Sequence, residues 1–163
     1  MLYSRCMKLV SAASLFIALI LSSLPNAIAQ SAESNAPDFS GMYSFQKDGE
    51  FMQITLEDKG AVSGFISRYG DSENDKGTFL DQFIKSGTSN GKQLSFTTET
   101  VHGVSYTFDG AFERGPGKKP EEDGYYVLRG TLTRNVAAPD GKMTTQSSQV
   151  EFRSFPRDTE APK

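Results

Sequence analysis

Among the side chains that could support chemistry, His102 most invites a catalytic interpretation. It is the only histidine of the chain, so a multi-histidine metal site is excluded. Ser95 and Ser105 are close to it in the sequence, but neither is framed by a Gly-x-Ser-x-Gly nucleophile motif. We therefore expect His102 to lie in a turn with a hydrogen-bonding role, and we assign no catalytic residue from the sequence.

Three carboxylates alternate with other residues in one polar segment. The side chains of Asp71, Glu73 and Asp75 could point at one centre and would suit a hard cation such as calcium. The spacing departs from that of an EF-hand loop, because Lys76 takes the position of the turn glycine and Gln82 that of the bidentate glutamate. We expect a solvated acidic loop and keep these three carboxylates as a weak metal-site candidate.

A second acidic group, Glu121, Glu122 and Asp123, follows two lysines in a connection rich in glycine and proline. Paired carboxylates hydrolyse glycosides when a rigid cleft holds them at a fixed separation. Adjacent acids at the tip of a flexible hairpin lack that fixed separation, so we expect them to be solvated. No pattern in the chain indicates a cofactor.

The start of the chain has the features of a secretory signal peptide. Arg5 and Lys8 precede an apolar run over residues 9–21, and residues 27–29 (Ala-Ile-Ala) match the small-apolar-small pattern that a signal peptidase accepts. A helix needs about 20 apolar residues to cross a bilayer, so this shorter run favours cleavage over a retained anchor. We place the cleavage before Gln30.

These features divide the chain into four expected parts. A helical signal peptide spans residues 1–29, a disordered leader 30–40, a single β domain 41–155 and a flexible tail 156–163. Cys6, the only cysteine, lies in the signal peptide, which excludes thiolate catalysis and thiolate metal sites from the mature protein. We expect the mature protein to be extracytoplasmic, either periplasmic or secreted, with no membrane span.

The charge balance argues against nucleic acid as a partner. The full chain has a net charge of −3, and removal of Arg5 and Lys8 with the signal peptide would take it to −5. Proteins that bind nucleic acid gather lysine and arginine on one face. No such basic cluster occurs in this sequence.

From Gly41 onward, short apolar runs are separated by turn residues at a spacing typical of all-β sandwiches and barrels. The turns combine Gly with Asp, Asn or Pro, as at 48–49, 58–60, 90–91, 115–117, 123–124 and 140–141. The strands expected between them cover residues 42–47, 51–57, 61–67, 78–85, 92–100, 104–113, 125–134 and 143–155. Consecutive hairpins of this kind predict one antiparallel up-and-down meander barrel of about eight strands.

Alternation with a period of two supports these strands. It is clearest where Val104, Tyr106, Phe108 and Phe112 share one face, with polar residues between them. The segment 79–84 suits a short helix as well as a strand, because its apolar residues are paired four positions apart. We favour a strand there.

The order of these motifs resembles that of a known superfamily. Residues 41–43 (Gly-Met-Tyr) open the first expected strand, and residues 60–65 (Gly-Ala-Val-Ser-Gly-Phe) fall in the third. This arrangement resembles the lipocalin and avidin superfamily of calycin-type, eight-stranded barrels. The segments 89–96 and 106–110 are also similar to those of a group of exported bacterial barrels. The resemblance implies a lipocalin-like or avidin-like fold and a ligand-binding role.

Aromatic residues expected to point into the barrel are candidate ligand contacts. Eight-stranded barrels are just wide enough to be filled by side chains or to hold one small ligand, and buried tyrosine hydroxyls require polar partners. The candidates, with His102 at the barrel mouth, are Tyr43, Phe45, Tyr106, Phe108 and Tyr126. Avidin pockets enclose biotin with several tryptophans. Tyr43 stands at one such position and the chain contains no tryptophan, which disfavours biotin.

We expect an exported, non-enzymatic binding module for a small apolar ligand or a protein partner. The alternative is a small secreted lyase, cyclase or isomerase using His102, Arg129 and Tyr125. A pocket containing His102 beside a carboxylate would favour the enzyme, whereas a barrel filled by side chains would disfavour it. A third alternative is a barrel-type protease inhibitor whose leader, residues 30–38, enters a protease cleft.

Overall fold

The structure is a computed structural model and describes residues 38–138 and 140–157. These residues belong to one compact unit. The expected signal peptide, most of the leader and the end of the tail lie outside them. Within the described residues, no helix is long and apolar enough to cross a membrane.

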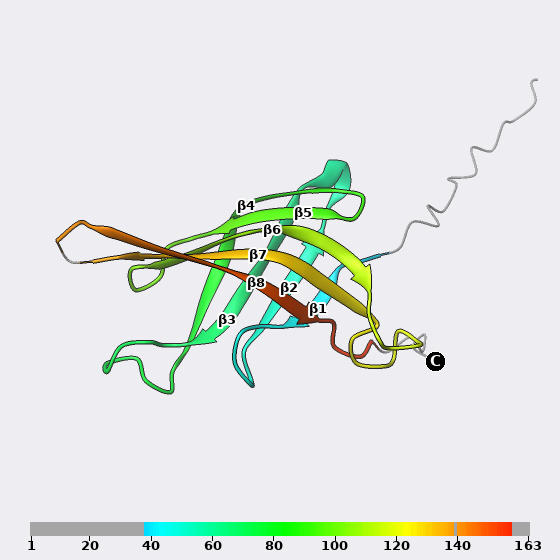
Figure 1. The fold of residues 1–163 in the computed structure, drawn as a ribbon, viewed down its shortest axis with the longest axis horizontal. Helices are drawn as coiled ribbons and strands as arrows, with labels where there is room; N and C mark the ends of the chain where they lie inside the picture. The colour runs from blue at the N-terminus through cyan, green and yellow to red at the C-terminus, as the bar shows by residue number, and fades with distance from the viewer. Residues whose placement is uncertain (1–37, 139, 158–163) are drawn as a thin grey trace, which may run out of the picture. The chain divides into compact units, whose positions relative to one another are not determined.

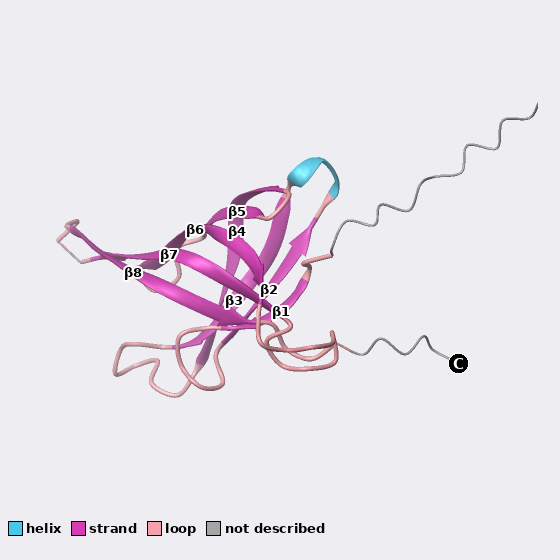
Figure 2. Ribbon diagram, turned by 45° about the vertical axis from the view of Figure 1, so that its right-hand side comes forward, coloured by secondary structure: helices cyan, strands magenta, loops and turns pink. Residues whose placement is uncertain are grey.

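Eight antiparallel strands form one sheet in the order in which they occur along the chain. Figures 1 and 2 show the sheet curling into a barrel, with a short 3-10 turn (η1, Asp58–Gly60) between the second and third strands. The strands are β1 (Gly41–Ser44), β2 (Phe51–Leu56), β3 (Val62–Tyr69), β4 (Phe79–Asn90), β5 (Gln93–Thr98), β6 (Val104–Arg114), β7 (Tyr126–Ala137) and β8 (Met143–Arg153). The predicted all-β meander barrel is confirmed, and the ambiguous segment 79–84 is a strand.

The barrel closes between β1 and β8 at one end of these strands. Tyr43 bridges Ser154, and the backbone amide of Phe155 donates to the carbonyl of Met42 at 2.9 Å. The earlier part of β8 pairs only with β7, and this long hairpin projects beyond the barrel body (Figure 1). Closure is therefore partial, because β1 is only four residues long.

Most strands differ from the prediction by one to three residues at an end, as where β7 continues to Ala137, and two larger differences have local reasons. β1 ends at Ser44 rather than Lys47, because the amide of Phe45 already donates across the turn to the carbonyl of Glu50 at 3.0 Å. β4 continues to Asn90, past a register shift between Ile84 and Ser86. The extra residue of such a bulge interrupts the alternation that the sequence prediction followed.

In a meander, every second connection lies at the same end of the barrel. Residues 45–50, 70–78 and 99–103 therefore form one end, which we call the mouth. The last of these connections contains a tight hairpin, in which His102 and Gly103 have φ of 49° and 75°. Two consecutive positive φ values are characteristic of a type I′ turn, which matches the twist of the paired strands. The prediction that His102 lies in a turn is confirmed.

Aromatic rings fill the barrel interior. Phe39, which precedes β1, stacks on Phe112 with ring centroids 4.6 Å apart. Phe45 packs on Phe152 at 5.3 Å, and Phe96 packs on Phe108 at 5.4 Å. The alternation predicted for β6 is confirmed, since its apolar members are buried and face this core.

Two facing glycines make room for these rings. Gly110 and Gly130 are paired across β6 and β7. A Cβ atom at Gly110 would lie 2.2 Å from the carbonyl oxygen of Arg129 and 2.5 Å from the Phe108 ring. The Arg129 carbonyl cannot move without disturbing the β6–β7 pairing, and the Phe108 ring cannot move without disturbing the core.

We predict that Gly110→Ala lowers the free energy of unfolding by about 2 kcal/mol, because the added methyl overpacks this crossing. Urea denaturation measures the change, and Thr107→Ala on the exposed face of the same strand is the control. Equal stabilities of the two variants would show that the strands have room to separate at Gly110.

Candidate functional site

A pocket of about 190 Å³ opens at the mouth. Its apolar walls are the side chains of Leu80, Val104 and Val136, from the mouth ends of β4, β6 and β7. Its polar lining comprises Arg68, Asp71, Ser72, Asp75, His102 and Arg134. The pocket therefore combines an apolar wall with a cluster of charged groups.

Arg68 is the least exposed charged group of this pocket, with a side chain only 2% exposed. Its Nε donates to Oε1 of Gln82 at 2.6 Å, and its Nη1 donates to the carbonyl of Tyr69 at 3.0 Å. Gln82 is also buried, and its Nε2 donates to the carbonyls of Val104 at 2.8 Å and Glu99 at 3.1 Å. A buried arginine is tolerated only when its donors are satisfied, and Gln82 supplies the acceptor that fixes its orientation.

Asp71 connects Arg68 to a second arginine. Its Oδ2 accepts from Nη1 of Arg68 at 3.0 Å and from Nη2 of Arg134 at 2.8 Å, while Oδ1 lies 3.5 Å from Nζ of Lys47. Burial alone would raise the pKa of Asp71, but the hydrogen bond from Arg134 and the charges of Arg68, Arg134 and Lys47 outweigh it and lower this pKa. Asp71 is therefore a carboxylate in the folded protein at neutral pH.

Tyr106 lies beside the same arginines. It is paired with Arg134 across β6 and β7. The guanidinium carbon of Arg68 lies 5.9 Å from the centroid of its ring. Burial raises the pKa of Tyr106 despite the opposing charges of these arginines. The hydroxyl is therefore neutral and contributes a hydrogen-bonding group near the pocket.

His102 meets a carboxylate at the rim of the pocket. Its Nδ1 lies 2.7 Å from Oδ2 of Asp75, which also accepts from the Ser72 hydroxyl at 2.7 Å. These hydrogen bonds from Ser72 and His102 lower the pKa of Asp75. The two partners are 27 positions apart in the chain and meet because the loop 70–78 and the β5–β6 turn share the mouth.

The predicted ligand contacts are divided between the mouth and the core. His102 lines the pocket at the mouth, whereas Tyr106 does not line it and belongs to the buried core, where its ring centroid lies 5.3 Å from that of Phe45. Tyr43, Phe45 and Phe108 lie within the packed interior. Tyr126 is at the opposite end, since it pairs with Arg114 at the far end of the β6–β7 ladder.

The buried Tyr43 has a partner within the chain. Its hydroxyl donates to the carbonyl of Phe39 at 2.7 Å, and burial raises its pKa far above the ordinary range despite the opposing charge of Arg157. A ligand is not needed to satisfy this group. From the sequence, the need of the Tyr43 hydroxyl for a hydrogen-bond partner suggested a ligand contact. The carbonyl of Phe39, just before β1, is that partner.

The carboxylates that were candidates for a metal site have other partners. Asp71 binds arginines and Asp75 binds His102, and among the described residues no group of three His, Cys, Asp or Glu side chains could hold a metal ion. Arg129 forms ion pairs with Glu113 and Glu151 at 2.7 Å each.

The enzyme alternative had joined Arg129 and Tyr125 to His102. Tyr125 stacks under Arg114, with the guanidinium carbon 3.5 Å from its ring centroid, at the end opposite to the mouth. That grouping of three residues is therefore wrong. The leader that would serve a protease inhibitor lies almost entirely outside the described residues.

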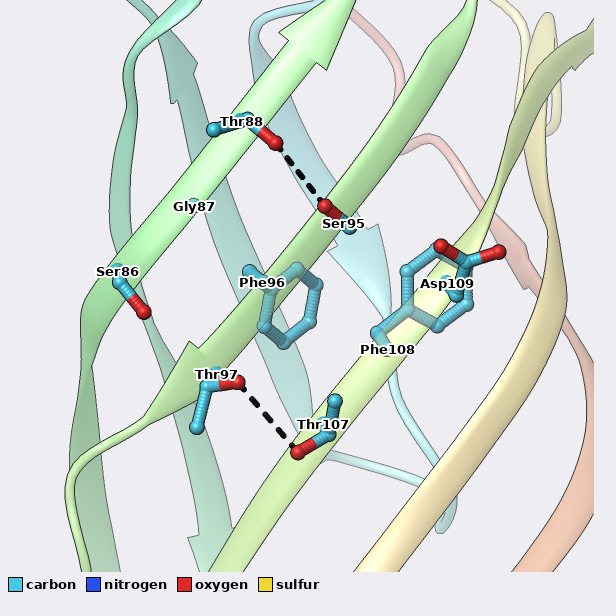
Figure 3. Close-up of a pocket in the computed structure, with 9 residues that line it drawn as sticks. All are labelled: Ser86, Gly87, Thr88, Ser95, Phe96, Thr97, Thr107, Phe108 and Asp109. Carbon is cyan, nitrogen blue, oxygen red and sulfur yellow. Dashed lines mark hydrogen bonds between the residues drawn. The ribbon is translucent and has the colours of Figure 1, made fainter.

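A second depression, of about 250 Å³, lies on the outer face of β4, β5 and β6. Figure 3 shows hydroxyl side chains along it, with hydrogen bonds between Thr88 and Ser95 (3.0 Å) and between Thr97 and Thr107 (3.4 Å). These groups satisfy one another, and Asp109 is the charged residue of its lining. The depression offers a polar surface without the buried cation that distinguishes the mouth.

The neighbouring serine Ser89 lies within a Gly-x-Ser-x-Gly sequence at residues 87–91, which the sequence analysis overlooked. A nucleophile elbow of this type joins a strand to a helix. Here the segment ends β4 and a turn leads into the strand β5. It also lies at the end of the barrel opposite to His102, so the motif has no catalytic partner there.

The architecture is an eight-stranded antiparallel meander barrel, a fold that is shared with avidin-type proteins of known structure. Solved structures with the same fold include rhizavidin, which is 14% identical, with a TM-score of 0.54 over 76% of this chain and 87% of that chain. The rhizavidin–biotin complex (15% identity, TM-score 0.52, 71% and 99% coverage) and apo short afifavidin (18%, 0.52, 74% and 98%) align similarly. No protein-family model and no curated protein sequence matches the chain. At these identities the likeness establishes the fold, as the resemblance in sequence motifs implied.

Sequence reasoning missed Arg68, Gln82 and Arg134. The expected third strand ended at Ser67, one residue short of Arg68. Because Ile66 faces the core, continuing the alternation by two residues would have placed Arg68 inside the barrel. Gln82 lies between the inward residues Leu80 and Ile84 and was detectable in the same way.

We predict that Gln82→Leu and Arg68→Met each lower the free energy of unfolding by about 2–3 kcal/mol, because each leaves a buried polar partner unsatisfied. The double variant loses about 1–2 kcal/mol less than the sum, since the shared hydrogen bond is removed only once. Urea denaturation of the four proteins measures this coupling. Strict additivity would show that the two side chains act independently.

The lowered pKa of Asp71 predicts a pH dependence. The folded protein holds this proton less tightly than the unfolded chain, so the stabilisation is complete above the ordinary value of 3.8 and is lost as the pH falls through the lower pKa of the folded state. Asp71→Asn should cost about 0.5 kcal/mol at neutral pH, and the deficit relative to wild type should shrink as the pH falls below 3.8. Denaturation midpoints across this range test it. A deficit independent of pH would contradict an electrostatic origin.

Proposed function

We propose that the protein binds a small molecule at the mouth pocket. The observation that carries this proposal is the oriented, almost fully buried guanidinium of Arg68 at the end of an apolar cleft. Ligand sites characteristically combine apolar walls with a few fixed polar groups. Here the walls are Leu80, Val104 and Val136, and the polar groups include Arg134.

The packed core supports binding at the mouth rather than in the barrel centre. Tyr43, Phe108 and Phe152 are almost completely buried and contact other rings. An occupant of the centre would have to displace these contacts, each of which contributes to stability. Of the six residues proposed from the sequence as ligand contacts, we retain His102, which lines the mouth pocket.

The expected signal peptide gives this binding a cellular setting. We propose that the chain is exported and that the barrel acts outside the cytoplasm, in the periplasm or beyond the cell. A barrel without cysteine suits such a location only if packing and hydrogen bonds stabilise it, because disulfides are the usual support of small exported domains. The ring-filled core and the Arg68–Gln82 hydrogen bond supply stability of this kind.

A catalytic role is the second candidate, because His102 and the carboxylate of Asp75 meet at the pocket rim. A carboxylate that binds one ring nitrogen orients the imidazole for proton transfer through the other. This is the pocket arrangement that favours the enzyme alternative, while the filled barrel disfavours it. The fate of a bound molecule separates the two roles: a binding module returns it unchanged, and an enzyme converts it.

We predict that the mature protein, incubated with a bacterial extract, retains a small molecule in native mass spectrometry. Val136→Phe should abolish the added mass by filling the pocket, because its larger ring occupies the apolar wall. Val150→Phe is the matched control, since Val150 is similarly half-buried on β8 but does not line the pocket. A bare chain mass for the wild type, or loss in both variants, would contradict binding at the mouth.

A further inference from the structure

We infer that the mouth pocket recognises a carboxylate on a short apolar chain, and that Asp71 occupies the place of this carboxylate when the ligand is absent. The inference rests on the proposed function and specifies its ligand class. It also assigns Asp71 a role as an intramolecular competitor.

The first argument is the way in which two guanidinium groups share one oxygen. Nη1 of Arg68 and Nη2 of Arg134 both donate to Oδ2 of Asp71, at 3.0 and 2.8 Å. Each guanidinium has a planar fork of donors that fits both oxygens of a carboxylate. One shared oxygen uses this capacity only in part, and a ligand carboxylate can present an oxygen to each arginine.

Two other acidic groups near the mouth, Glu50 and Asp75, are already engaged elsewhere. Glu50 is buried and accepts from the backbone amides of Lys47 at 3.1 Å and Tyr69 at 3.0 Å. Asp75 is held by Ser72 and His102. Among the hydrogen bonds described, Asp71 is the carboxylate that binds both arginines. When its side chain moves away, no other carboxylate in the described part of the chain replaces it in these bonds. The two arginines are then open to an anionic ligand.

The two arginines differ in burial, which suits recognition. Arg68 is fixed by Gln82 and by the Tyr69 carbonyl. Arg134 is 30% exposed and lies on the hairpin side of the pocket. Because Arg68 is already fixed, it gives the ligand a defined position without a further loss of side-chain entropy. The partly exposed Arg134 can adjust its position to the bound carboxylate.

Asp71 can leave without disturbing the barrel. Its side chain is 37% exposed, and it lies in the loop between β3 and β4 rather than in a strand. The loop has bonds of its own that do not involve the Asp71 side chain: the Gly70 amide donates to the Thr78 carbonyl at 3.0 Å, and the Asp75 amide donates to the Ser72 carbonyl at 3.0 Å. A rotation of the Asp71 side chain therefore frees the arginines while the loop stays closed on itself.

The walls specify the rest of the ligand. Leu80, Val104 and Val136 offer aliphatic surface beside the arginines, and the pocket volume of about 190 Å³ suits a short chain. Burial of such a chain contributes roughly 0.8 kcal/mol per methylene, so the carboxylate supplies orientation and the chain supplies affinity. A six-carbon monocarboxylate is an appropriate probe.

The test is a titration by NMR of the mature protein with hexanoate, 1-hexanol and hexylamine, which differ in the head group alone. The proteins are the wild type, Asp71→Asn, Arg134→Gln and Asp109→Asn. The last variant removes the same charge from the outer face of β6, away from the mouth. The amide spectrum of each free variant verifies that it is folded.

We expect hexanoate to bind Asp71→Asn about twofold more tightly than wild type, since an internal contact that contributes about 0.5 kcal/mol raises the apparent Kd of a competing ligand by that factor. Asp109→Asn should match wild type, and Arg134→Gln should bind hexanoate more weakly. Hexanol and hexylamine should gain nothing from Asp71→Asn.

The remaining outcomes separate the two levels of the proposal. Equal binding of the three probes would overturn the carboxylate preference and leave small-molecule binding at the mouth intact. An equal gain in hexanoate affinity in Asp71→Asn and Asp109→Asn would show that the gain comes from the change in net charge. That result would overturn the role of Asp71 as a competitor. Absence of binding by any of the three probes to any variant would overturn this inference, whereas the proposed function is tested separately by the native mass spectrum.

Discussion

The arginine held inside the mouth of this barrel constrains the structure around it. Removing a guanidinium from water costs several kcal/mol unless its donors are satisfied. Gln82 therefore faces inward on β4 among apolar neighbours, and its amide in turn binds the carbonyls at the β5–β6 connection. Retention of the polar pair suits a site that presents a charge, rather than a core built for stability alone.

The rest of the interior is arranged differently. Rings from β1, β5, β6 and β8 contact one another, and the paired glycines on β6 and β7 give them space. An eight-stranded barrel has little volume to spare, so an interior filled in this way leaves its ends as the places where a ligand meets protein groups. The incomplete pairing between β1 and β8 does not open the interior to a ligand, because Phe45 and Phe152 cover it there.

Much of this fold could be predicted from the sequence, because turn chemistry and two-residue alternation are local. Glycines after Asp48 and Asp140 adopt positive φ as expected, and β6 is buried on the expected face. The mouth depends on contacts that local patterns do not encode. His102 meets Asp75 across 27 positions, and Arg134 meets Asp71 across 63. Whether aromatic residues fill a barrel or line a cavity also depends on three-dimensional packing, which alternation leaves open.

The position of a bound molecule tests the account most directly. Intermolecular nuclear Overhauser effects between hexanoate and the protein report which protons are in contact. The account predicts cross-peaks from the aliphatic chain of hexanoate to the methyl groups of Leu80, Val104 and Val136. Cross-peaks to the rings of Phe108 and Phe152, without those to the mouth methyls, would place the ligand in the barrel centre and contradict it.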